Sequence, residues 1–251
     1  LLDDNKIVFA INEERLSRIK LCRGFPKRSI EYLIEKYAKP EEVDKVVVGS
    51  KYIDFMPNSE DSSKGDLDEI NRKALSKFSS FGGFFFKTNL WIPVNEAAFK
   101  ILFWNRKQKI AKVLREHGFK CPIEFVDHHT SHAASAYHTC GKDNVLVFTS
   151  DAAGDALSAT VSIGKNGKLE RIGRVNAYNS LGKLYTYVTE ICGFKPVRHE
   201  GKITGLAAYG KPTHIDVFNN MVIYKNGGFV NISNSKHDRS KEIIMKKIGE
   251  N

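Results

Sequence analysis

Three histidines lie close together in the middle of the chain, at His128, His129 and His132. His128 and His132 are four residues apart, so on a helix they share one face about one turn apart. Neutral imidazoles on one face bind ions such as zinc, iron, copper and nickel. The spacing predicts a metal site, and a helix start that histidines cap and solvate is the alternative.

His129 stands where the zinc-protease pattern His-Glu-x-x-His has its glutamate. That glutamate is the general base of the protease reaction, so its absence disfavours metal-assisted peptide hydrolysis. We expect His129 to lie at the helix start or behind the metal-binding pair.

The elements around these histidines follow from the hydrophobic pattern. An apolar run at 123–126 predicts a strand, and the Ala-rich segment after Asp127 predicts a helix. Residues 144–151 predict a strand that ends in Asp151, and residues 151–155 a tight turn. Two more strands are expected, at 156–163 and through Val175, joined by an Asn166-Gly167 hairpin. The amides of such an acidic, small-residue turn face a phosphate, and its Asp faces a cation.

Other segments complete a mixed α/β pattern. Strands are expected at 6–12 and 43–48, with a helix at 28–37 between them, and the opening residues resemble part of a hairpin. Residues 95–117 have the spacing of a long amphipathic helix closed by Gly118. A helix at 180–192, with Ser180 as its N-cap, and a hairpin at 221–232 follow.

Composition leaves several classes open. The net charge of +10 suits either nucleic acid or anionic phosphorylated substrates. The basic residues are scattered and no nucleic-acid-binding motif accompanies them, so a nucleic-acid partner is disfavoured. No apolar run is long enough to span a membrane, which predicts no membrane partner. The four cysteines form no Cys-x-x-Cys pair, which indicates reduced thiols in a cytoplasm.

Four segments in a fixed order carry a family resemblance. They are Glu13-Glu14-Arg15-Leu16-Ser17-Arg18-Ile19-Lys20, the run from Asp127 to Tyr137, the Asp151 turn, and the run from Glu200-Gly201-Lys202 to Gly210-Lys211-Pro212. In this combination the sequence resembles the O-carbamoyltransferases of the nodulation-factor, tobramycin and cephamycin type. The resemblance covers residues 1 to about 215 and is weakest between 50 and 118.

The resemblance implies a fold and a place within it. It implies an α/β domain of the actin, Hsp70 and sugar-kinase fold (ASKHA), similar to the threonylcarbamoyl-transferase subunit, with a mixed sheet and flanking helices. Residues 1–251 would form a single partial domain, the N-terminal portion, with 50–118 as an insertion or acceptor-side subregion. Because Leu1 is no Met start and the family's adenylate-forming C-terminal domain is absent, we expect the chain to be a fragment.

The resemblance also implies a reaction and its site residues. A carbamoyl group would pass from carbamoyl phosphate, through carbamoyladenylate made with ATP, to a hydroxyl of a small-molecule acceptor. Fe²⁺, or another divalent metal, would be held by His128, His132 and Asp151. The residues expected to contact the nucleotide or carbamoyl group are Gly182, Glu200, Lys202, Gly205 and Gly210. No catalytic base and no particular acceptor is assigned.

Alternatives remain at several points. The same scaffold suits a threonylcarbamoyl- or kinase-type phosphotransferase, and the chain could also be a non-catalytic nucleotide- or nucleic-acid-binding domain. Glu200 and Lys202 could form only a surface ion pair. Arg15, Arg18 and Lys20 could approach an anionic ligand or simply line a solvated edge.

Overall fold

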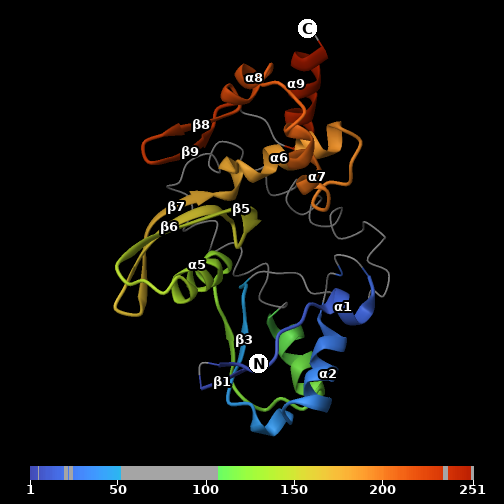
Figure 1. Cartoon of the computed structure of the whole chain (residues 1–251), viewed down its shortest axis with the longest axis vertical. Helices are drawn as coiled ribbons and strands as arrows, with labels where there is room; N and C mark the ends of the chain where they lie inside the picture. The colour runs from blue at the N-terminus through green and yellow to red at the C-terminus, as the bar shows by residue number, and fades with distance from the viewer. Residues whose placement is uncertain (5, 20–21, 23–24, 52–106, 234–236, 250–251) are drawn as a thin grey trace. The chain divides into compact units, whose positions relative to one another are not determined.

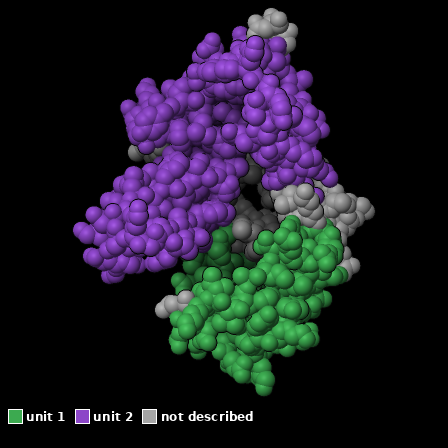
Figure 2. Space-filling view, viewed as in Figure 1, with its two compact units in different colours: residues 1–81, 98–127 green, residues 82–97, 128–251 purple. Residues whose placement is uncertain are grey.

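The computed structural model describes residues 1–4, 6–19, 22, 25–51, 107–233 and 237–249. The chain divides into two compact units, which Figure 2 colours separately. Unit 1 comprises residues 1–81 and 98–127, and unit 2 comprises residues 82–97 and 128–251. Both mix helices with small sheets, so the structure is α/β, as the sequence predicts. The expected insertion at 50–118 lies outside the described residues except at 50–51 and 107–118.

Unit 1 begins with a short hairpin of β1 (Leu2–Asp3) and β2 (Lys6–Ile7). The strand expected at 6–12 is therefore too long. The N–H groups of Val8 and Phe9 bond to the carbonyl of Leu1, which ends the ladder after two residue pairs.

Helices α1 (Glu13–Ser17) and α2 (Lys27–Lys36) come next, and the helix expected at 28–37 is confirmed by α2. Glu13 joins the two helices through its carboxylate. Its Oε1 accepts the N–H of Arg28 at 3.0 Å, and its Oε2 accepts the N–H and the hydroxyl of Ser29 at 2.8 and 2.6 Å. A carboxylate at this end of a helix satisfies exposed N–H groups and the positive end of the dipole. The motif that begins at Glu13 thus has a structural role in this chain.

The core of unit 1 forms around a parallel strand pair. A 3₁₀ turn, η1 (Pro40–Glu42), leads to β3 (Val46–Val48), which pairs with β4 (Ile123–Phe125). Residues 107–116 are helical, and Gly118 follows with φ +92°, the left-handed conformation expected of a closing glycine. Ile110, Leu114 and Phe119 are buried against apolar side chains of α2, β3 and β4.

Unit 2 is built on a three-stranded antiparallel sheet. Its strands are β5 (Val145–Gly154), β6 (Leu157–Lys165) and β7 (Lys168–Asn176), in the order β5-β6-β7. Asn166 and Gly167 both have positive φ in the β6–β7 turn, as the expected Asn-Gly hairpin requires. Figure 1 shows α5 (His128–Thr139) lying along the sheet, where Ala133 and Tyr137 pack with Val147.

The turn between β5 and β6 differs from the expected one. β5 continues to Gly154 instead of ending at Asp151, and its register with β6 shifts between Ser150 and Gly154. The chain reverses at Asp155 and Ala156, both with positive φ. A β-bulge therefore extends the strand past Asp151 and reorients the residues near it.

The remaining elements of unit 2 form a second core. After the 3₁₀ turn η4 (Ala177–Asn179) come α6 (Gly182–Ile191), α7 (Glu200–Ala207) and α8 (Ile215–Asn219). The hairpin expected at 221–232 is confirmed by β8 (Val222–Lys225) and β9 (Gly228–Asn231), and α9 (His237–Gly249) follows. Tyr187, Met221, Val222 and Ile244 form the core that these elements share. Among the described residues, no helix has the length and apolar character that a membrane crossing needs.

Candidate metal centre

The histidine helix α5 is oriented by its buried side. His129, Ala133 and Tyr137 are four residues apart in turn and all buried, so they form the stripe that faces the sheet. His128 and His132 lie on the adjacent side of the helix. The backbone N–H of His128 donates to Asp155 Oδ2 at 2.8 Å, so the turn after β5 caps the start of α5.

Asp151 approaches this helix from β5. Asp151 and Thr149 of β5 both contact histidines of α5, Asp151 through His128 and Thr149 through His129. The Asp151 Oδ1 accepts the N–H of Ala152 at 2.6 Å, and its main-chain carbonyl accepts the hydroxyl of Ser180 at 3.2 Å. The first contact limits the rotation of the carboxylate, and the second holds the backbone from which it projects.

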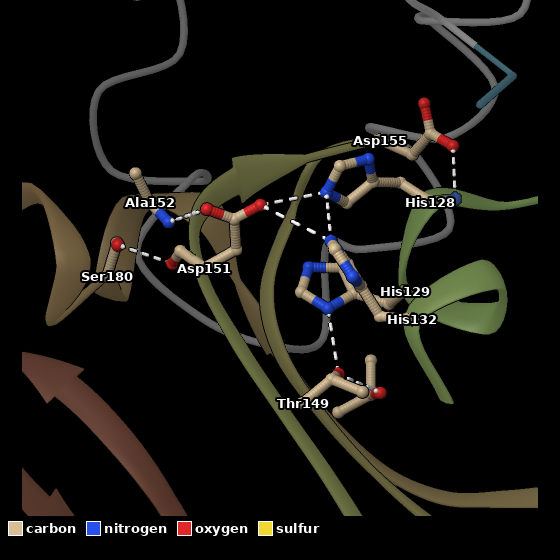
Figure 3. Close-up of polar contacts among 9 residues, drawn as sticks. His128, His129, His132, Thr149, Asp151, Ala152, Asp155 and Ser180 are labelled. Atoms are coloured by element: carbon tan, nitrogen blue, oxygen red, sulfur yellow. Dashed lines mark hydrogen bonds and ion pairs between the residues drawn. The ribbon is translucent and has the colours of Figure 1, made fainter. Parts of the chain in front are cut away.

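The three predicted metal ligands meet in space, as Figure 3 shows. His128 Nε2 lies 2.8 Å from Asp151 Oδ2, His132 Nε2 lies 3.8 Å from the same oxygen, and the two Nε2 atoms are 3.1 Å apart. Ligands bound about 2.1 Å from one ion are separated by roughly 3.0–3.4 Å, depending on coordination geometry. The donor atoms are thus spaced much as a shared ion requires.

The exposure of the cluster leaves one side accessible. The side chain of His128 is 22% exposed, that of Asp151 38% and that of His132 56%. Two nitrogens and one oxygen suit iron or zinc, and three protein ligands leave coordination positions for water or substrate. In donor chemistry and spacing, the residues fit a divalent metal ion.

Gly154 provides space for this arrangement. A Cβ placed on it would lie 2.6 Å from His128 Nε2 and closer still to other atoms of the ring. Real Cβ contacts are not so short, so any larger residue would displace the His128 ring. The glycine of the acidic turn is therefore required where the imidazole meets Asp151.

The electrostatics of Asp151 favour its ionised form. The hydrogen bond from His128 is the largest influence and lowers the pKa of Asp151, with smaller contributions from the Ala152 N–H and the charges of His128 and His132. Partial burial acts in the opposite direction but is outweighed. A carboxylate that stays ionised is the form that binds a metal.

Helix α6 reaches the centre at its first turn. Ser180 accepts the N–H of Lys183 at 3.2 Å, which agrees with its expected capping role. At Gly182 an added Cβ would lie 2.8 Å from the backbone of Ala152, so close packing on β5 already requires a glycine there. Burial lowers the pKa of the Lys183 amine, a residue to which the sequence reasoning gave no role.

The other residues expected to contact a nucleotide lie on or after α7. Glu200 Oε1 accepts the N–H of Val197 at 2.5 Å, and Lys202 Nζ lies 5.3 Å from the centre of the Phe194 ring. At Gly205 an added Cβ would meet nothing within 4 Å, and at Gly210 its nearest neighbour is the Ala207 carbonyl at 3.7 Å. These glycines are therefore not explained by packing within the described chain.

Of the basic residues in the Glu13 motif, Arg18 has φ +60° just after α1. Lys20 lies outside the described residues.

All four cysteines, Cys22, Cys121, Cys140 and Cys192, are free thiols, as expected.

Comparison with known proteins places the chain in context. The family model described as "Carbamoyltransferase N-terminus" matches residues 1–250. The chain is 28% identical over 231 residues to the nodulation protein NolNO of Sinorhizobium fredii, covering 91% of this chain and 30% of that protein. It is also 28% identical over 209 residues to the uncharacterized protein MJ1051 of Methanocaldococcus jannaschii, covering 83% of this chain and 30% of that protein.

A shorter match reaches higher identity. The nodulation protein NolO of Bradyrhizobium diazoefficiens is 34% identical over 87 residues, which is 35% of this chain and 16% of that protein. The chain thus spans about 30% of the length of NolNO and of MJ1051.

Proposed function

Because the chain belongs to the carbamoyltransferase N-terminus family, we propose that it carries the metal-binding part of an ATP-dependent O-carbamoyltransferase. The carbamoyl group would come from carbamoyl phosphate, pass through carbamoyladenylate and reach a hydroxyl of a small-molecule acceptor. Family membership over nearly the whole chain and the similarity to nodulation proteins support this proposal. An adenylate-forming domain belongs to the same proposal as the source of the carbamoyladenylate.

The proposed fold is the N-terminal portion of an actin, Hsp70 and sugar-kinase type domain. Three features of unit 2 support it: the antiparallel β5-β6-β7 sheet, the acidic turn after β5, and a helix that follows the sheet. The sheet positions Asp151, and α6 packs on the backbone beside it.

His128, His132 and Asp151 are the proposed ligands of a divalent ion, Fe²⁺ in our proposal. When bound, such an ion would supply a Lewis acid that polarises a carbonyl oxygen and offsets phosphate charge. The residues themselves hold the site in a defined shape. Asp155 caps α5, Ala152 and Ser180 restrain Asp151, and Gly154 leaves room for the His128 ring. Preorganised groups of this kind need little rearrangement during the reaction.

The proposed nucleotide-contacting residues are Gly182, Glu200, Lys202, Gly205 and Gly210. Lys202 is exposed and can offset phosphate charge, while Glu200 holds the start of α7 through Val197. Gly205 and Gly210 leave the backbone open to close approach by a ligand. The acceptor hydroxyl would attack the carbamoyl carbon as the bond from that carbon to the adenylate oxygen breaks, releasing AMP and the proton of the hydroxyl.

The single observation that carries the proposal is the convergence of three metal-ligand atoms within 4.8 Å of one another. We expect the chain, purified without oxygen, to bind one equivalent of Fe²⁺ or of Co²⁺ as a spectroscopic probe. His132→Ala should lower the affinity by more than the roughly 10–100-fold that loss of a supporting hydrogen bond costs. Titration followed by the visible absorption of Co²⁺ measures both the number of ions bound and the affinity.

The matched control is His138→Ala, an exposed histidine on the same helix outside the cluster. It should bind metal as the wild type does. Equal affinities of wild type and His132→Ala would contradict the proposed centre. ATP binding by a chain that binds no metal would instead favour a non-catalytic nucleotide-binding domain.

A further inference from the structure

The buried stripe of α5 contains a histidine where an apolar residue would be less costly. His129 is fully buried, and it shares the stripe with Ala133 and Tyr137. The sheet below it is polar as well, since Thr149 is 7% exposed and Thr160 is 1% exposed. Burying polar groups costs free energy unless they form hydrogen bonds, so three such residues together call for a physical reason.

These three side chains form one hydrogen-bonded chain across α5, β5 and β6. His129 Nδ1 lies 2.8 Å from Thr149 Oγ1, which lies 2.7 Å from Thr160 Oγ1. Thr149 and Thr160 are direct partners in the β5–β6 ladder. A hydroxyl has one proton and two lone pairs, so Thr149 donates to at most one of these neighbours and accepts from the other or from both. Either way the contact is directional, which apolar packing is not.

These hydrogen bonds lie beside the cluster of proposed metal ligands, and both groups of contacts join α5 to β5. His128 and His129 are consecutive on α5, while Asp151 and Thr149 are two residues apart on β5 and both contact that helix. The His129–Thr149 bond therefore fixes the position of α5 on β5 next to the point where His128 meets Asp151. Figure 3 shows the His128–Asp151 contact and the His129–Thr149 contact close to each other. The next residue of α5 has a contact of its own with the sheet: Arg171 of β7 donates to the hydroxyl oxygen of Thr130, with 2.9 Å between the nitrogen and the oxygen.

We propose that His129 and Thr149, supported by Thr160, are positioning residues that hold α5 on β5 so that His128 and His132 face Asp151. Apolar residues of similar size would bury the same surface but would let the helix slide or rotate. A shift of about 1 Å is enough to separate ligands of one ion. The effect of these residues on metal binding rests on the proposed function. Their effect on the position of α5 on β5 can be measured in the metal-free chain and does not depend on that function.

Thr149→Val tests the proposal, because it keeps the volume and removes the hydroxyl. We expect the dissociation constant for Co²⁺ to rise by up to about 10-fold, the lower end of the effect of losing a direct partner of a metal ligand, because Thr149 acts through His129, which is not a proposed ligand. In the metal-free chain, the imidazole ¹⁵N resonances of His128 should move as its contact with Asp151 loosens. Thr149→Ser keeps the hydroxyl and should restore both properties.

Thr189→Val is the matched control. Thr189 is also fully buried, but its hydroxyl donates to the Tyr185 carbonyl within α6. Its replacement should leave the Co²⁺ affinity and the His128 resonances unchanged. If Thr149→Val does not fold, Thr160→Val carries the test, with a smaller change expected in the same direction.

The outcomes separate the two proposals. If the replacement at Thr149, or at Thr160 in its place, leaves the His128 resonances as in the wild type, the positioning role is wrong. If the wild-type chain binds no Co²⁺ or Fe²⁺, the proposed metal centre is wrong, and the resonances of the metal-free chain alone decide the positioning role. Equal changes of the His128 resonances in Thr149→Val and Thr189→Val would also contradict the positioning role, because they would show a general effect of losing a buried hydroxyl.

Discussion

Each of the three oxygens of Asp151 has a partner. One carboxylate oxygen faces His128 and His132, the other accepts the Ala152 N–H, and the main-chain carbonyl accepts the Ser180 hydroxyl. The orientation of the carboxylate is thus fixed by the chain itself. Ligands held in advance bind an ion without paying to order their side chains, which favours both affinity and selectivity.

At the same scale, Gly154→Ala tests the space beside His128. The new methyl group would displace the imidazole from Asp151, since a Cβ there would be 2.6 Å from Nε2. We expect Co²⁺ affinity to fall by about tenfold or more, in the range of a lost supporting contact, while the chain stays folded. Equilibrium titration measures the affinity, and circular dichroism checks the fold.

Gly173→Ala in β7 is the control, because its Cβ would meet only Val161 at an ordinary 3.5 Å. It should bind Co²⁺ as the wild type does. A Gly154→Ala chain that also binds normally would show that the His128 ring is not confined there.

At the scale of the elements, the N-termini of α5 and α2 are capped by carboxylates from distant parts of the sequence. Asp155 caps α5 from 27 residues away, and Glu13 caps α2 from 15 and 16 residues away. Each cap satisfies backbone N–H groups and also fixes where the helix starts relative to another element. In α5 the start of the helix is the position of His128, the first of the proposed metal ligands.

Glu13→Gln tests the cap of α2. It removes the charge and one of the two acceptor oxygens that face Arg28 and Ser29. We expect the free energy of unfolding to fall by about 0.5–2 kcal/mol, the usual cost of losing an N-cap. Chemical denaturation followed by circular dichroism measures it. Glu31→Gln, which breaks only an exposed ion pair with Lys27 on the same helix, should cost about 0.5 kcal/mol or less.

The residues that meet in the cluster are more readily found in the sequence than the contacts that support them. Helical spacing paired His128 with His132, and the end of an apolar run pointed to Asp151, because both signals are local. The contacts of His129 with Thr149 and of His128 with Asp155 span 20 and 27 residues. No local periodicity encodes such contacts. The turn was misplaced for a related reason, since the bulge that extends β5 depends on its register with β6.

At the scale of the whole molecule, each unit has a core of its own. Ile110, Leu114 and Phe119 are buried in unit 1, and Val147 is buried under α5 in unit 2. All three proposed metal ligands belong to unit 2. Stability lost in the core of unit 1 should therefore leave the metal centre unchanged, whereas losses under α5 should not.

Leu114→Ala and Val147→Ala test this separation. Leu114→Ala should lower the free energy of unfolding by about 2–5 kcal/mol, the range for a buried leucine, with little effect on Co²⁺ affinity. Val147→Ala should weaken Co²⁺ binding as well, because it loosens the packing of α5 on β5. Denaturation and titration of both variants check the expectation, and equal Co²⁺ affinities in the two would contradict it.

The direct contacts of His128, His132 and Asp151 with one another and with Asp155 lie between residues 128 and 155, and the supporting contacts from Thr160, Arg171 and Ser180 come later in the sequence. Closing so short a loop costs little conformational entropy, and local contacts of this kind form early when a chain folds. During synthesis, α5 leaves the ribosome first, and β5 then brings Asp151 and the Asp155 cap to it. The three proposed ligands can therefore come together on the nascent chain before β8, β9 and α9 have been made.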